Sequence, residues 1–170
     1  MSERAPAGAP GGRRVGLGHD IHRLEPGHPL VLGGVAIPAE RGFATPSDGD
    51  VLCHALIDAL AGALVEGDLG AFFPADDDPA AQGARSLDYL AAMGRHVASR
   101  DCRVEHVDAY LTLGTTRLAP HLDAMRANVA AALGVPVDRV SVKARTNDGL
   151  GPEGEGRAAS ATVVVLVAER

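Results

Sequence analysis

The stretch SDGDVLCHALIDALAGALVEGD (residues 47–68) decides the fold class because it contains a long helical pattern. Its apolar residues recur at the spacing of one helix face, at Leu52, Ala55, Leu56, Ala59, Leu60 and Ala63. Ser47 followed by Asp50 resembles a capping box at the start of this helix, and Gly67 predicts its end. A helix with so apolar a face needs a layer to pack against, so strands are expected on both sides of it in the chain.

Short alternating or aliphatic runs predict these strands. Before the helix, residues 14–20 alternate with Val15 and Leu17 on one face, and residues 30–32 form a second run that precedes turns at Gly33-Gly34 and Pro38. After the helix, strands are expected at residues 107–113, 140–144 and 158–168. These runs supply the sheet that the helix would cover.

Two further helices complete the predicted order of elements. Ser86 is expected to cap one that ends near Ser99, and Pro120 suits the first turn of another that stops at Gly134. The order β, β, α, α, β, α, β, β predicts an α+β single domain whose mixed or antiparallel sheet carries helices on one face, of the ferredoxin-like type. Residues 1–13 show no periodicity and predict a disordered tail, which leaves residues 14–170 as the domain.

Composition excludes several classes of function. With 16 Lys+Arg, 22 Asp+Glu and 3% aromatic residues, the chain has a net charge of −6 and lacks the basic, aromatic surfaces of nucleic-acid-binding proteins. The longest aliphatic run, residues 163–168, is too short to span a bilayer, so no membrane association is expected. Cys53 and Cys102 give no disulfide framework, which favours a soluble protein of the reducing cytoplasm.

A possible metal site comes from Asp20, His22 and His54. In an extended segment the side chains of Asp20 and His22 leave the same face, so both can bind one ion. His54, on the predicted helix, would complete the three protein ligands of an open zinc site. The alternative is that Asp20 caps a turn and that the histidines are solvated.

Three other segments combine polar groups with glycines. Residues 47–50 offer a helix N-terminus that attracts anions, and Asp68 between Gly67 and Gly70 can accept hydrogen bonds from hydroxyl groups. Residues 143–151 (KARTNDGLG) follow a strand with cations, a hydroxyl, an amide and Asp148, a mixture that can hold phosphate or Mg²⁺. Simple helix capping, a helix-terminating turn and a polar surface turn remain the respective alternatives.

Five motifs occur in one order along residues 14–168: GHDIH (18–22), LGGVAIP (32–38), SDGDVLCHALIDAL (47–60), GDLGAFFP (67–74) and RLAPHLDAMR (117–126). Together they resemble the 2-C-methyl-D-erythritol 2,4-cyclodiphosphate synthase family of the non-mevalonate isoprenoid pathway. The resemblance implies a homotrimer whose sheets line the centre, with active sites between neighbouring subunits.

The resemblance also implies a reaction and its cofactors. The substrate would be 4-diphosphocytidyl-2-C-methyl-D-erythritol 2-phosphate, whose 2-phosphate attacks the β-phosphorus so that CMP leaves and a cyclic diphosphate forms. The cofactors would be Zn²⁺ or another divalent cation, together with Mg²⁺ or Mn²⁺. No partner beyond this small molecule and further copies of the chain is expected.

Residue roles follow from the same resemblance. Asp20, His22 and His54 match the zinc ligands, and the first two of them also border the substrate. Asp148 matches the magnesium ligand, which is usually Glu, and it forms the catalytic set with Thr146 and Ser47. The remaining substrate-binding residues would be Asp50 beside the phosphates, Asp68 and Gly70 on the methylerythritol hydroxyls, Leu113, Arg117, Leu118 and Ala119 in the cytidine pocket, and Arg145 with Thr146 near the diphosphate.

Two departures from the family pattern keep other functions open. Pro46 stands where the family usually has His, and residues 145–148 read RTND where many members read TTTE. These differences are compatible with a paralogous cyclase or phosphohydrolase acting on another nucleotide-linked phosphate. A non-catalytic homologue that binds metal and CDP is the remaining alternative.

Overall fold

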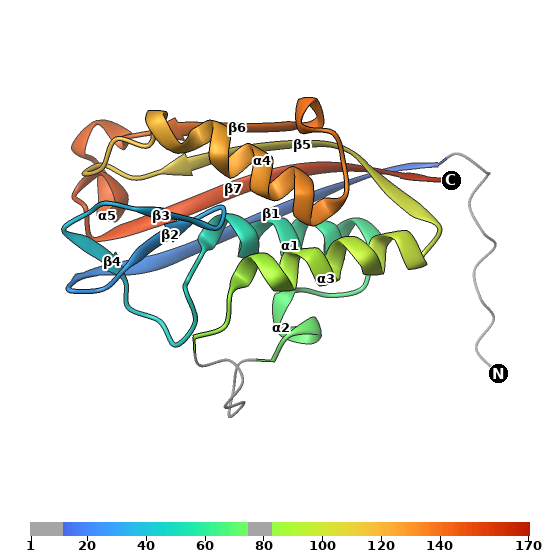
Figure 1. Ribbon diagram of the computed structural model, residues 1–170, viewed down its shortest axis with the longest axis horizontal. Helices are drawn as coiled ribbons and strands as arrows, with labels where there is room; N and C mark the ends of the chain where they lie inside the picture. The colour runs from blue at the N-terminus through green and yellow to red at the C-terminus, as the bar shows by residue number, and fades with distance from the viewer. Residues whose placement is uncertain (1–11, 75–82) are drawn as a thin grey trace.

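The computed structural model of the protein describes residues 12–74 and 83–170 (Figure 1). Residues 1–11 of the predicted tail at residues 1–13 lie outside the described residues. Arg13 differs from the expectation, because it is the first residue of strand β1. Within the described ranges, no helix combines the length and hydrophobicity that a membrane-spanning segment requires.

A five-stranded sheet runs through the molecule in the order β4-β1-β7-β5-β6. Its strands are β1 (Arg13–Pro26), β4 (Arg41–Phe43), β5 (Cys102–Thr112), β6 (Val140–Arg145) and β7 (Ala158–Glu169). Only β5 and β6 pair in parallel among the neighbours in this sheet, so the expected mixed sheet is confirmed. A separate hairpin is formed by β2 (Leu30–Leu32) and β3 (Val35–Ile37).

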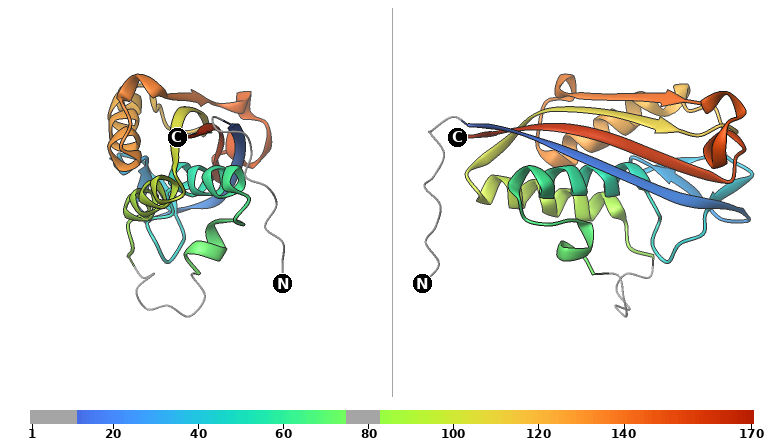
Figure 2. Two further views of the ribbon diagram at one scale, coloured as in Figure 1. Left: turned by 90° about the vertical axis from the view of Figure 1, so that its right-hand side faces the viewer. Right: turned by 180° about the vertical axis from the view of Figure 1, so that it is seen from behind.

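The three long helices lie on one face of this sheet, as predicted: α1 (Val51–Leu64), α3 (Ser86–Ser99) and α4 (Leu122–Leu133) (Figures 1 and 2). Short helical turns fill the connections: α2 (Leu69–Phe72), η2 (Ala119–His121), η3 (Val137–Arg139), η4 (Asn147–Gly149) and α5 (Gly151–Gly154). Helix α1 is the centre of the core, because all of its residues except Asp58 and Gly62 are buried.

The ferredoxin-like expectation is wrong. The long elements follow each other as β1-α1-α3-β5-α4-β6-β7, whereas a ferredoxin-like domain has the order β-α-β-β-α-β. Helix α4 carries the chain across the sheet and thereby makes β5 and β6 parallel, and β7 then returns between β1 and β5. Hydrophobic periodicity identifies such elements but does not determine which strand lies beside which.

The ends of two helices also differ from the expectations. Asp50, not Ser47, caps α1, because Gly49 adopts a left-handed φ of 65° that interrupts the helix before it. Helix α1 ends at Leu64 rather than at Gly67, with Val65 as its left-handed C-cap. Ser86 is the first residue of α3 and not its cap.

Helix α1 approaches β1 closely at two glycines. A Cβ atom at Gly16 would lie 1.8 Å from the carbonyl oxygen of Ala59, and one at Gly18 would lie 1.9 Å from that of Ala55. Both obstacles are backbone atoms of a buried helix, so a flexible side chain cannot give way. Only glycine therefore fits at these two inward-facing positions of β1.

We expect Gly16→Ala to lower the free energy of unfolding by about 3 kcal/mol or more, because helix and sheet must separate to admit the methyl group. Gly62→Ala is the matched control, since its added Cβ atom meets no described residue within 4 Å outside its own stretch of helix, and the helix interior favours Ala by about 1 kcal/mol. Urea unfolding of both variants measures the difference. Equal stability of the two variants would refute the close contact.

Candidate functional site

Three acceptor atoms converge where β1 passes the first turn of α1. Asp20 and His22 occupy alternate positions of β1 that face α1, and His54 lies on α1 itself. The distances are 3.0 Å from Asp20 Oδ2 to His54 Nδ1, 3.3 Å from His22 Nε2 to His54 Nδ1, and 3.4 Å from His22 Nε2 to Asp20 Oδ2. The sequence expectation that these three side chains meet agrees with this geometry.

The triangle has the size of one face of a metal coordination tetrahedron. Zinc bonds of about 2.0–2.1 Å to nitrogen and oxygen place neighbouring ligand atoms about 3.3 Å apart. His22 also turns the correct nitrogen inward, because its Nδ1 lies 2.9 Å from the carbonyl oxygen of Ile21 and can donate to it. The ligand atoms of these three residues all lie within 4.8 Å of one another. The group therefore fits a divalent metal ion.

The charge state of Asp20 favours a cation. Burial raises the pKa of Asp20, but its contacts with the rings of His54 and His22 lower that pKa by more, so that the net pKa lies below its ordinary value. Asp20 is therefore a carboxylate at neutral pH. Its second oxygen, Oδ1, accepts a hydrogen bond from Ile21 N at 2.9 Å, which fixes the orientation of the group.

Asp50 is occupied by internal hydrogen bonds. It is fully buried; its Oδ1 accepts from Leu52 N and Cys53 N, and its Oδ2 accepts from Gly34 N at 2.7 Å and from the Cys53 thiol. Both of its oxygens thus have partners within the protein, and the expected place of Asp50 beside the substrate phosphates stays a prediction. Burial, followed by the nearby Asp50 carboxylate, raises the pKa of Cys53 well above its usual range, so this thiol stays neutral.

Ser47 and Asp68 occupy turns at opposite ends of α1. Ser47 is half-buried and its Oγ accepts from Gly49 N, which shapes the loop before the helix. Asp68 caps the short helix α2 through Ala71 N, and both Asp68 and Gly70 are exposed. These groups lie at the surface near the start and the end of the helix that carries His54.

Asp58 is a half-buried carboxylate near the metal triad that the sequence interpretation did not select. It follows His54 by one helical turn, and its Oδ1 accepts a 2.7 Å hydrogen bond from Leu69 N. Burial raises the pKa of Asp58, and the hydrogen bond from Leu69 N lowers it. Because burial has the larger effect, the net pKa lies above its ordinary value. Spacing of four residues from a candidate ligand was the available signal, since such residues share a helix face.

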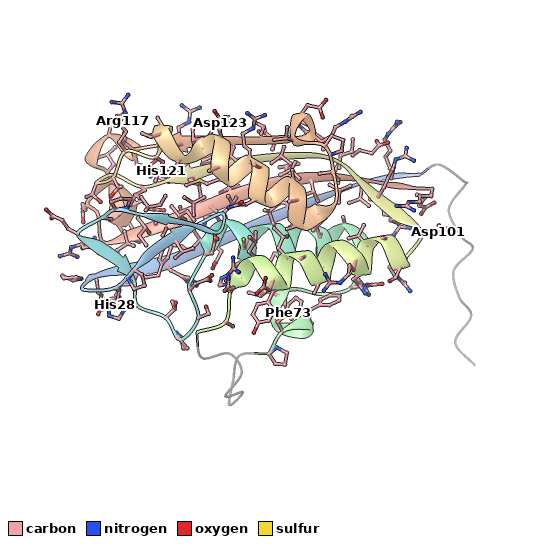
Figure 3. All side chains as sticks on the ribbon, viewed as in Figure 1. His28, Phe73, Asp101, Arg117, His121 and Asp123 are labelled. Atoms are coloured by element: carbon pink, nitrogen blue, oxygen red, sulfur yellow. The ribbon has the colours of Figure 1, made fainter. Side chains whose placement is uncertain are left out.

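A second cluster of expected site residues lines a cavity of about 450 Å³ beside the ends of β5 and β6. Its walls contain seven residues that the resemblance selected, and the structure adds three neighbours, Thr116, Ala144 and Asn147; the seven are Leu113, Arg117, Leu118, Ala119, Arg145, Thr146 and Asp148. Arg117, labelled in Figure 3, extends from the edge of the molecule just before η2. Apolar walls with cationic side chains suit a nucleotide.

Asp148 sits on a special backbone turn within this cavity. Asn147 and Asp148 both adopt left-handed φ values, of 58° and 50°, and Asp148 is exposed. Thr146 Oγ1 accepts from Asp148 N at 3.3 Å, which ties the turn together. The carboxylate is accessible, but none of the metal-triad residues Asp20, His22 and His54 lines the same cavity.

Comparison with known proteins matches residues 13–168 to the model described as the YgbB family. A curated relative from Moorella thermoacetica, "2-C-methyl-D-erythritol 2,4-cyclodiphosphate synthase", is 50% identical over 157 residues, which cover 92% of this chain and 96% of that protein.

Two solved structures are similar in fold. The first, "Structure of the Bifunctional IspDF from Campylobacter jejuni", has a TM-score of 0.89 and 31% identity, with 94% of this chain and 43% of that chain covered; this chain thus spans less than half of that one. The second, a CDP-bound 2C-methyl-D-erythritol-2,4-cyclodiphosphate synthase, has a TM-score of 0.82 and 38% identity, with 91% and 99% covered.

If the triad binds a divalent metal ion, we expect His54→Ala to lose that binding, because only two ligands on one strand then remain. Elemental analysis of purified protein measures the metal content. His28→Ala is the control, since His28 lies in the exposed turn after β1 (Figure 3). Normal metal content in His54→Ala would contradict the ligand assignment.

Proposed function

The chain belongs to the YgbB family, and we propose that it is a 2-C-methyl-D-erythritol 2,4-cyclodiphosphate synthase. The substrate is then 4-diphosphocytidyl-2-C-methyl-D-erythritol 2-phosphate. The observation that carries the proposal is the convergence of Asp20, His22 and His54 at metal-ligand distances in a chain of this family. The relative with CDP bound supports a cytidine nucleotide as part of the substrate.

The reaction needs no nucleophile from the protein. An oxygen of the substrate's 2-phosphate attacks the β-phosphorus of the diphosphate, a new P–O bond closes the ring, and the bond to CMP breaks so that CMP leaves with its electron pair. Two polyanionic groups must therefore be brought together against their repulsion. Positioning of reactants within one site contributes up to about 7–11 kcal/mol in well-oriented cases.

Divalent cations supply positive charge for the phosphates in such a site, with Asp20, His22 and His54 as ligands for zinc and Asp148 for magnesium. The chain's own groups hold the rest of the substrate. Arg117 and Arg145 place guanidinium groups at the cavity, and Leu113, Leu118 and Ala119 supply its apolar wall. Thr146 offers a hydroxyl to the diphosphate, and Ser47 offers one near the start of α1.

Asp68 and Gly70 are proposed to hold the methylerythritol hydroxyls. The carboxylate of Asp68 is exposed, and one of its oxygens accepts from Ala71 N, which orients the group; among residues 12–74 and 83–170 no hydrogen bond occupies the other oxygen. The hydrogen bond from Leu69 N to Asp58 anchors the same turn to α1. The turn is thus connected to the helix that presents His54.

We also propose a homotrimer with active sites between subunits. The sheet face opposite the helices exposes Val15, Leu17, Tyr110 and Val164, and paired strands bring Leu17 and Val164 side by side. Burial of this face between copies would remove apolar surface from water. It would also allow the triad of one chain to complete the cavity of another, which is consistent with the absence of the triad residues from the lining of that cavity within one chain.

Purified protein incubated with the proposed substrate and Mg²⁺ is expected to release CMP, and Asp148→Asn to reduce turnover by more than about 100-fold because a carboxylate ligand is lost. Chromatography of nucleotides measures CMP. Absence of CMP from folded, metal-loaded protein would refute the cyclase. Release of inorganic phosphate or of another nucleotide instead would identify the paralogous activity.

Light scattering is expected to give a mass of about three times the 17.4 kDa of one chain. Leu17→Asp should lower it to one chain, because a buried unpaired carboxylate opposes association. Val65→Asp is the control, since Val65 is 83% exposed at the end of α1, away from the sheet face. A trimeric Leu17→Asp variant would contradict the proposed interface.

A further inference from the structure

His54, Ser86 and Asp48 form a hydrogen-bonded series on the side of the His54 ring that faces away from Asp20 and His22. Nε2 of His54 lies 2.9 Å from Ser86 Oγ, and Ser86 Oγ lies 2.5 Å from Asp48 Oδ1. His54 and Ser86 are both buried, and Asp48 is half-buried in the loop before α1. The series thus engages Nε2 of His54, whereas Nδ1 faces Asp20 and His22.

The direction of the hydrogen bonds follows from donor counting. The hydroxyl of Ser86 has one hydrogen, and the carboxylate of Asp48 can only accept. Ser86 therefore donates to Asp48 and must accept from His54. The proton of the neutral His54 ring is then on Nε2, which leaves the lone pair of Nδ1 directed at Asp20 and His22.

His22 shows the same arrangement with a simpler partner. Its outward Nδ1 can donate to the carbonyl oxygen of Ile21 at 2.9 Å, which leaves Nε2 free on the inner side. Both histidines thus have an acceptor on the outer nitrogen and a lone pair on the inner one. An acceptor of this kind orients a ligand ring and raises its basicity.

We propose that Ser86 and Asp48 are positioning residues that hold His54 in its metal-binding tautomer and orientation. The proposal rests on the metal site of the proposed function, and neither residue belongs to the triad of ligand atoms. It also explains the orientation of Asp48, whose carboxylate turns inward from the loop before α1 toward Ser86.

Asp48 has a structural role as well, which the test must separate. Its carboxylate also accepts from Ser86 N and from Asp50 N, and these bonds tie the loop to the start of α3. Ser86→Ala removes the hydroxyl link and keeps the backbone link. It is therefore the sharper variant, and its effect on zinc binding reports the link to His54.

The first experiment measures zinc affinity of the full-length chain by competition with a chromophoric chelator. Ser86→Ala is expected to bind zinc about 10- to 100-fold more weakly. Ser99→Ala is the matched control, because it removes a hydroxyl from the last turn of the same helix, where Oγ donates to His96 O within the described part of the chain. Ser86→Ala within twofold of wild type would overturn the proposal.

A double-mutant cycle tests whether Asp48 acts through Ser86. Asp48→Asn is expected to weaken zinc binding in the wild-type background and to have no added effect in Ser86→Ala. Equal weakening in both backgrounds would assign Asp48 a purely structural role and would overturn the proposal that Asp48 positions His54 through Ser86.

A spectroscopic readout keeps the proposal testable even where a variant fails to fold. Long-range ¹H–¹⁵N spectra of zinc-loaded wild-type protein are expected to show His54 with its proton on Nε2; the signal is identified by its loss in His54→Ala. A proton on Nδ1 would overturn the proposal. CMP release is assayed separately. If zinc binding depends on Ser86 but no CMP is released, the proposed synthase activity is refuted and the proposed positioning of His54 is not.

Discussion

The contact between α1 and β1 is the constraint on which the rest of the structure depends. Gly16 lies against Ala59 and Gly18 against Ala55, so two residues along the strand correspond to one turn of the helix. Asp20 and His22, the next inward-facing positions of β1, then meet the first turn of α1 and His54. Because the two glycines have no side chains, β1 and α1 approach closely, and the ligand atoms lie within 3.0–3.4 Å of one another.

Much of this arrangement could be predicted from the sequence. The alternation in β1 placed Asp20 and His22 on one face, and the periodicity of α1 identified the helix that carries His54. The cavity residues depended on the family resemblance, because Arg117 and Thr146 are 29 positions apart and no local pattern joins them. The strand order could not be predicted from such patterns, since parallel β5 and β6 pair across a helix.

The helix ends were less predictable because side-chain partners decided them. Ser47 and Asp50 both suit an N-cap, and the left-handed Gly49 between them selects Asp50. Ser86 also resembles a cap, but its hydroxyl bonds to Asp48 and His54, which are distant in sequence. Polar residues with long-range partners are thus misassigned by a local rule, and here they surround the proposed metal ligands.

The separation of the metal triad from the nucleotide cavity on one chain has a genetic consequence. In the proposed assembly each active site takes its triad from one subunit and its cavity from the next. A chain damaged at His54 and a chain damaged at Asp148 each lack one half, but a mixed assembly contains sites in which both halves are intact. Two inactive alleles of the same gene would then restore each other's function in one cell.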